Sequence, residues 1–135
     1  MIRRFFTGAA LAVILAAGVT GCSTSHEPVA SKTVAVADLT ATITPTPNPP
    51  QTGDNTLTLI LKDSAGNLVP NANISATAVT KLTGNTGATE SARSDGNGSY
   101  RVPIHTPVSE LYFVTLTIQR TGRKDVVMKY GIKPV

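Results

Sequence analysis

The chain has 135 residues, with twelve lysines and arginines against eight aspartates and glutamates, one cysteine and no tryptophan. The length allows one small domain plus a tether, and a single cysteine excludes a framework of intrachain disulfides. Arg3 and Arg4 lie in a segment that we expect to be removed, which leaves ten basic against eight acidic residues. That balance is not typical of a nucleic-acid-binding protein, so no nucleic acid partner is expected.

The N-terminal residues have the order of an export signal. Arg3 and Arg4 precede an apolar run at residues 8–20, which is shorter than the roughly 20 residues that a membrane-spanning helix needs. The motif Val19-Thr20-Gly21-Cys22 follows, with an aliphatic residue and two small residues before the cysteine. It resembles the lipobox of bacterial lipoproteins. The resemblance implies that residues 1–21 are a signal peptide cleaved between Gly21 and Cys22, and that the Cys22 thiol carries lipid.

Lipidation predicts how the protein is held. Two or three acyl chains such as palmitate attach a protein stably to a bilayer, so Cys22 anchors the chain to a membrane with no cofactor besides this covalent lipid. Ser23, where aspartate would signal inner-membrane retention, favours an outer-membrane location facing the periplasm. Two alternatives are an ordinary secretory signal followed by a chance cysteine, and an uncleaved anchor helix.

The segment after Cys22 predicts a tether and a first strand. Residues 22–33, which include His26, are polar and lack periodicity, as expected for a flexible tether. Residues 34–44 alternate and are β-prone, which predicts one strand. Four prolines within residues 45–50 favour an extended segment, either a stiff crossing between strands or a spacer before the domain.

Residues 51–135 show short alternating segments separated by turn residues, with no sustained helical period. This pattern predicts an all-β fold, a small antiparallel immunoglobulin-like β-sandwich of about seven strands. The strands are expected at residues 56–62, 72–78, 100–104, 111–120 and 124–132, with a short edge strand near 89–93. The expected core consists of aliphatic side chains: Leu57, Leu59, Leu61, Ile74, Val102, Val114, Leu116, Ile118 and Val126.

Several polar positions have ordinary structural interpretations. Asp63 and Asp95 stand in turn sequences, where the carboxylate commonly accepts hydrogen bonds from nearby amides. Pro103 predicts a strand edge or end. The basic C-terminal stretch from Arg120 to Lys133 favours a solvated strand edge, with contact to anionic lipid headgroups or an acidic partner as the alternative.

Two blocks at residues 47–59 and 61–74 resemble a known family. The first is Pro47-Asn48-Pro49-Pro50-Gln51-Thr52-Gly53-Asp54-Asn55-Thr56-Leu57-Thr58-Leu59, a proline-rich segment that runs into an alternating strand. The second carries an Asp-x-x-Gly turn, and Gly96-Asn97-Gly98-Ser99-Tyr100 matches a later element. Together they resemble YtkA-like domains, which are related to the FixH group. The resemblance implies an immunoglobulin-like fold outside the cytoplasm and a link to copper handling or oxidase assembly.

This sequence departs from the family where a methionine-rich loop is usual. Residues 76–92 contain no Met, His or Cys, and these are the side chains that soft copper sites use. Met128 stands at a predicted core position. No metal site is therefore expected.

No constellation for catalysis is evident, since no serine stands in a nucleophile context and no carboxylates are paired for acid–base work. His105 is expected in a surface loop, and Tyr100 and Tyr112 in the core or at its rim. The sequence favours a non-enzymatic envelope lipoprotein whose domain binds or supports another envelope component. The alternatives are a periplasmic copper or small-ligand carrier and a structural surface lipoprotein. The partner-binding residues are not specified; a solvent-facing strand or the expected loop at residues 80–92 would be suitable.

Overall fold

A computed structural model describes residues 31–135. The predicted export signal, the predicted lipidation site Cys22 and His26 lie outside these residues. The described part contains nine strands and no helix, so no helix in it is long and apolar enough to span a bilayer. The strands are β1 (Lys32–Val36), β2 (Leu39–Thr46), β3 (Gly53–Asp63), β4 (Asn73–Thr80), β5 (Thr86–Ser91), β6 (Arg93–Gly96), β7 (Ser99–Thr106), β8 (Tyr112–Gln119) and β9 (Val126–Ile132).

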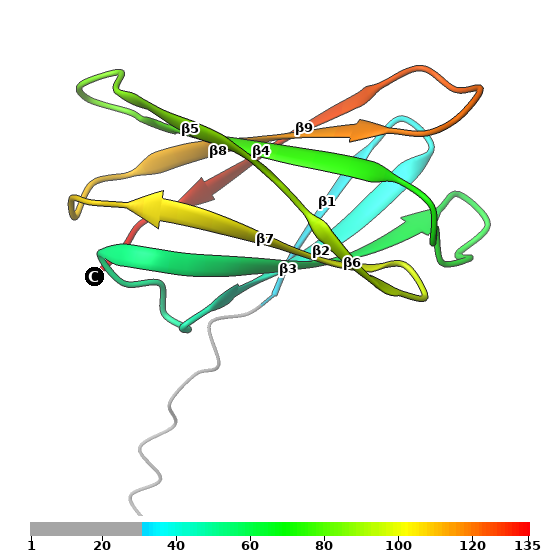
Figure 1. The fold of residues 1–135 in the computed structure, drawn as a ribbon, viewed down its shortest axis with the longest axis horizontal. Helices are drawn as coiled ribbons and strands as arrows, with labels where there is room; N and C mark the ends of the chain where they lie inside the picture. Colours follow the sequence, from blue (N-terminus) through cyan, green and yellow to red (C-terminus); the bar gives the residue numbers. More distant parts are fainter. Residues whose placement is uncertain (1–30) are drawn as a thin grey trace, which may run out of the picture.

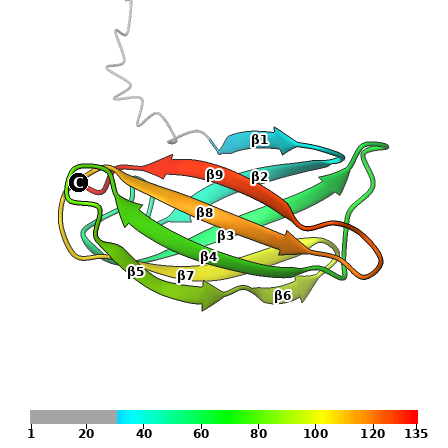
Figure 2. The same cartoon turned by 90° about the horizontal axis from the view of Figure 1, so that it is seen from above.

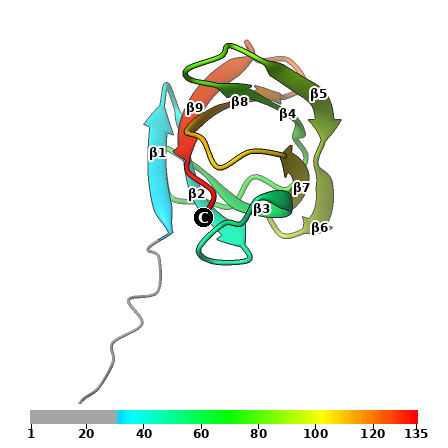
Figure 3. The same ribbon diagram turned by 90° about the vertical axis from the view of Figure 1, so that its left-hand side faces the viewer.

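The strands form two antiparallel sheets in the orders β1-β2-β3-β7-β6 and β5-β4-β8-β9. The sheets face each other across the core (Figures 1 and 2). The predicted all-β sandwich is confirmed, with nine strands where about seven were expected. Seen from one end, the sheets enclose the interior, and β1 lies beside β9 (Figure 3). The Lys32 ammonium group lies 5.7 Å from the centre of the Tyr130 ring, a cation–π contact between those two strands.

The prediction of one strand at residues 34–44 was wrong, because β1 and β2 are two strands of a hairpin. Ala37 adopts the left-handed conformation at their turn, with φ of 53°. No glycine or proline marks that turn, so the alternation seemed continuous. The predicted tether boundary at residue 33 is also corrected, since β1 begins at Lys32. Both strands belong to the same sheet as β3 and are therefore part of the domain.

The prediction of a loop at residues 80–92 was wrong over most of its length. β5 occupies Thr86–Ser91 as an edge strand whose side chains are almost all exposed, so it has no apolar alternation to reveal it. The chain then changes sheets at Ala92, whose N–H donates to the Ile74 carbonyl at 2.7 Å, and continues as β6. The edge strand expected near 89–93 is thus divided between β5 and β6.

The core lies between the sheets, and all nine side chains predicted for it are buried. Tyr100, Tyr112 and Met128, for which the core was also expected, are buried as well. Alternating residues of β2 add a further buried row that was not predicted from the sequence: Leu39, Ala41 and Ile43. A fully buried aliphatic side chain contributes about 1.5–3 kcal/mol, so β2 supplies a substantial part of the packing.

The proline-rich segment crosses from β2 to β3, as one of the two sequence interpretations expected. A buried amide holds its end in place. The Asn55 Nδ2 group donates to the Gln51 carbonyl at 2.7 Å and to Thr106 Oγ1 at 2.9 Å, and Asn55 Oδ1 accepts from the Gln51 N–H at 2.9 Å. The crossing is therefore attached to β3 and β7 through one side chain.

Two ends of the sandwich are distinct in Figure 1. The hairpin end, at the right, carries the turns β1–β2, β6–β7 and β8–β9 and the β3–β4 connection at residues 64–72. The crossover end, at the left, carries the proline crossing, the β4–β5 loop at residues 81–85, the β7–β8 connection and the C-terminal residues. β1 runs toward the hairpin end, so its first residue, Lys32, is the end of the strand that lies away from that end.

Candidate binding site

Charged side chains from both sheets meet at the hairpin end. Asp38 comes from the β1–β2 turn, and Arg120 and Arg123 come from the β8–β9 turn. Arg120 Nη1 donates to Asp38 Oδ2 at 3.0 Å and Arg120 Nη2 to Asp38 Oδ1 at 2.7 Å, while Arg123 Nη1 donates to Oδ2 at 2.9 Å. The Arg120 contact is the bidentate fork that guanidinium and carboxylate geometry favours. These three residues, the Arg–Asp cluster, connect the two sheets at this end.

Burial divides the roles of the two arginines. The Arg120 side chain is 10% exposed and Asp38 is 34% exposed, whereas Arg123 is 63% exposed. The hydrogen bonds from Arg120 lower the pKa of Asp38 below its usual value, and the same contact raises the pKa of Arg120. Among the described residues, Arg120 Nε is a buried donor without a partner. Arg120 is thus committed to the cluster, and Arg123 keeps free N–H donors in solvent.

A hollow of about 500 Å³ adjoins the cluster. The β8–β9 turn forms one side with Arg120, Thr121 and Arg123. The β3–β4 connection forms the other with residues 68–71, among which Leu68 exposes an apolar side chain. The Asp38 and Asp63 carboxylates also line the hollow, and each already accepts hydrogen bonds, Asp38 from the two arginines and Asp63 from backbone N–H groups. The hollow therefore combines an exposed guanidinium and two engaged carboxylates with an aliphatic wall.

The β3–β4 connection is held by hydrogen bonds from buried and backbone groups. The Tyr100 hydroxyl donates to the Val69 carbonyl at 2.6 Å and accepts from the Ala72 N–H at 3.1 Å. Asp63 Oδ1 accepts from the N–H groups of Ala65 and Asn67 at 3.0 and 2.9 Å. A wall fixed in this way loses little conformational entropy when a ligand binds.

The β6–β7 turn supports the same wall. Asn97 and Gly98 have φ of 52° and 75°, the signature of a type I′ hairpin turn, as the Asn-Gly sequence favours. A Cβ atom on Gly98 would lie 3.0 Å from Leu68 Cβ and 3.1 Å from the Val69 nitrogen. Only glycine allows this close approach of the turn to the β3–β4 connection.

The site residues predicted from sequence have mixed outcomes. Asp63 is confirmed as a turn aspartate that accepts backbone N–H bonds. The same prediction for Asp95 was wrong, because its carboxylate accepts from Arg101 Nη2 at 2.8 Å. The solvated edge predicted for the basic stretch was wrong for Arg120, which is nine-tenths buried.

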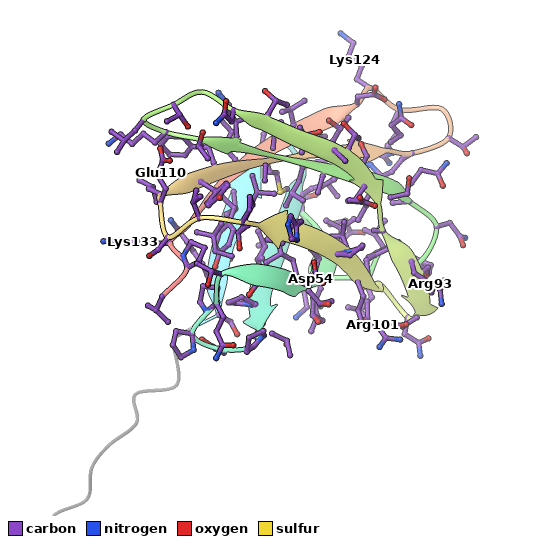
Figure 4. All side chains as sticks on the ribbon, turned by 60° about the vertical axis from the view of Figure 1, so that its left-hand side comes forward. Asp54, Arg93, Arg101, Glu110, Lys124 and Lys133 are labelled. Carbon is purple, nitrogen blue, oxygen red and sulfur yellow. The ribbon has the colours of Figure 1, made fainter. Side chains whose placement is uncertain are left out.

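His105 lies on β7 and not in the predicted loop, although its predicted exposure is confirmed. Its Nδ1 atom lies 2.7 Å from Asp54 Oδ1, and both side chains are exposed. Pro103 is confirmed at a strand edge, because β6 pairs with β7 only over residues 99–101. Figure 4 shows Asp54 on the sheet and Arg101 beside Arg93, away from the crossover end.

Comparison with known proteins supports the fold alone. No protein family and no curated protein matches this chain. Among solved structures, a copper-bound variant of FetP from uropathogenic Escherichia coli strain F11 is 17% identical with a TM-score of 0.57, covering 78% of this chain and 95% of FetP. A DUF4426 family protein from Pseudomonas aeruginosa PAO1 is 10% identical with a TM-score of 0.55, covering 76% of this chain and 94% of that protein. The YtkA-like resemblance stays a prediction.

Proposed function

We propose that this chain is a non-enzymatic, lipid-anchored domain of the bacterial envelope, and that its hairpin end binds an acidic segment of another envelope protein. The observation that carries the proposal is the preformed hollow beside Arg123. The N–H donors of Arg123 that face solvent are suited to bind a carboxylate of the partner. The exposed Leu68 wall suits an apolar side chain next to that carboxylate in the partner.

The path of the chain supports the anchoring half of the proposal. β1 starts at Lys32, and Ser31 is fixed by a 2.6 Å hydrogen bond between its Oγ and Thr44 Oγ1. Residues 23–30 separate Ser31 from Cys22 and span at most about 30 Å. With lipid on Cys22, the domain stays close to the membrane, and Ser23 favours the outer membrane facing the periplasm.

The electrostatics of the cluster favour binding over catalysis. Asp38 receives three N–H donors from two arginines, and its lowered pKa makes it a weak base. The buried Arg120 has no freedom to follow a reacting group. The cluster is therefore suited to hold charge in a fixed position.

The copper-carrier alternative follows from the YtkA-like resemblance and from the copper bound to FetP. Within residues 31–135 no group of three or more His, Cys, Asp or Glu side chains is placed to hold a metal. Met128 is buried in the core, and His105 is paired with Asp54 on the sheet surface. Titration of the purified protein with Cu(I) and Cu(II) separates the two functions, since stoichiometric binding tighter than micromolar would favour the carrier.

Site-specific photocrosslinking in cells tests the partner-binding proposal. A photoreactive residue at Thr121, which lines the hollow, should capture an envelope protein, and one at Thr115 on the outer face of β8 should not. Arg123→Glu should abolish the capture. Lys124→Glu is the matched control, because the neighbouring residue undergoes the same charge change outside the hollow. Equal capture by both variants would contradict the proposed site.

Labelling with palmitate tests the anchor separately. The wild-type protein should incorporate the label, and Cys22→Ser should not. A wild-type chain without label would refute lipid anchoring whatever the crosslinking shows.

A further inference from the structure

We propose that the crossover end rests on an anionic lipid bilayer when the chain is anchored. This inference rests on the lipid attachment of the proposed function and assigns a second surface, distinct from the hairpin end. Exposed aliphatic side chains lie on three segments of this end. Leu82 is 83% exposed at the β4–β5 loop, and Val108 and Val135 are exposed on the β7–β8 connection and the C-terminal segment.

Hydrogen bonds join these three segments into one surface. The Glu110 Oε1 atom accepts from the Leu82 and Thr83 N–H groups at 2.6 and 3.2 Å. The Lys81 N–H donates to the Leu111 carbonyl at 2.8 Å. Ser109 Oγ donates to the Pro134 carbonyl at 2.9 Å.

The loop that carries Leu82 is also held internally. The Asn85 N–H donates to Thr80 Oγ1 at 2.8 Å, and the Gly84 N–H donates to the Thr80 carbonyl at 3.1 Å. These hydrogen bonds fix the backbone of the loop, and the Leu82 side chain is largely exposed to solvent. A fixed loop with an exposed leucine is suited to insert that side chain into an apolar layer.

The charges around the leucine fit an anionic bilayer. Lys81 and Lys133 are both exposed at this end, and the Glu110 carboxylate is occupied by two N–H donors. Figure 4 places Glu110 and Lys133 on one side of the molecule, away from Lys124. Lysine side chains are attracted to an anionic membrane surface, and the aliphatic stem of a lysine can lie along the apolar boundary.

The reach of the tether is compatible with this contact. Residues 23–30 hold Ser31 within about 30 Å of Cys22, and β1 runs from Ser31 toward the hairpin end. Contact at the crossover end turns the hairpin end away from the bilayer. The Arg–Asp cluster is then presented to a partner in the aqueous phase.

Depth-dependent fluorescence quenching tests the contact. The mature chain, residues 22–135, is coupled through its single cysteine to a maleimide lipid in vesicles of phosphatidylglycerol and phosphatidylcholine. The chain has no tryptophan, so Leu82→Trp and Leu68→Trp each introduce one reporter at an exposed leucine, one at each end. Brominated acyl chains should quench the emission at position 82 several-fold more than at position 68. Equal quenching, or stronger quenching at position 68, would overturn the proposal.

Charge variants of the Leu82→Trp chain supply the second arm. Lys81→Glu combined with Lys133→Glu should reduce the quenching on anionic vesicles, whereas Lys124→Glu at the hairpin end should leave it unchanged. If Lys124→Glu reduces the quenching as much as the double variant does, the assignment of this surface is overturned. Because chemical coupling replaces cellular lipidation, the measurement reads the contact even if palmitate labelling refutes the anchor.

Discussion

Tyr100→Phe removes one oxygen atom from a buried ring, and that atom makes two hydrogen bonds to the β3–β4 connection, one to the Val69 carbonyl and one from the Ala72 N–H. A typical hydrogen bond contributes about 0.5–1.5 kcal/mol net. The Val69 carbonyl and the Ala72 N–H belong to half-buried residues, so water replaces part of what is lost. We expect the free energy of unfolding to fall by about 1–3 kcal/mol. In a domain of this size each 1 kcal/mol lowers Tm by roughly 4–8 °C.

Urea and thermal unfolding followed by circular dichroism measure this change, with Tyr130→Phe as the matched control. Tyr130 is also buried, but its hydroxyl makes no hydrogen bond to the described residues, so the same atom is removed without a lost partner. Tyr130→Phe should shift Tm little. An equal shift in both variants would refute the assignment of the stability to the Tyr100 hydrogen bonds. Tyr100→Phe should also weaken crosslinking at Thr121, because it releases the wall of the hollow.

Three further predictions concern the turns, the Arg–Asp cluster and the crossing. Gly98→Ala and Gly122→Ala both place alanine at positive φ, which costs about 1–3 kcal/mol of strain. Of the two, only a Cβ added at Gly98 would have other atoms within 4 Å, so in urea unfolding Gly98→Ala should lower the free energy of unfolding by about 1–3 kcal/mol more than Gly122→Ala does. Equal losses of stability in the two variants would contradict this steric argument. The pKa of Asp38 is lowered in the fold, so the stability that its ionised form contributes is fully present above the ordinary value of about 4 and is lost as the pH falls through the lowered folded pKa. The Tm difference between wild type and Asp38→Asn should therefore narrow progressively as the pH falls below about 4. A Tm difference that does not change with pH would exclude this ionisation. Asn55→Ala should cost about 1–3 kcal/mol by leaving the Thr106 and Gln51 groups without their partner; unchanged urea unfolding would show that water replaces the amide.

The fold was predictable because most strands bury one face. Alternation at period two identifies which residues point inward without any knowledge of pairing, and every aliphatic residue expected inside is buried. Only the end of β5 was anticipated, as part of the short edge strand expected near residues 89–93, because neither face of β5 is apolar. The β1–β2 turn escaped detection because Ala37 takes a conformation that sequence reasoning assigns to glycine or asparagine.

The candidate site was much less predictable. Asp38 and Arg120 stand 82 positions apart, and no local pattern brings them together. Their contact depends on which turns share an end of the sandwich, and thus on strand order and register. The sequence features closest to an indication of this contact were Asp38, a lone aspartate inside a β-prone segment, and Arg120, which directly follows the strand with the clearest alternation. Both positions fit a solvent-exposed turn equally well.

The direction of β1 has a mechanical consequence. A partner held at the hairpin end and a lipid held at Cys22 would pull on this strand along its own axis. The backbone hydrogen bonds between Lys32–Val36 and β2 would then be loaded in shear. They would share the force and would not break one after another. If the proposed anchor and partner are both present, attachment through this edge strand would resist tension between the membrane and the partner.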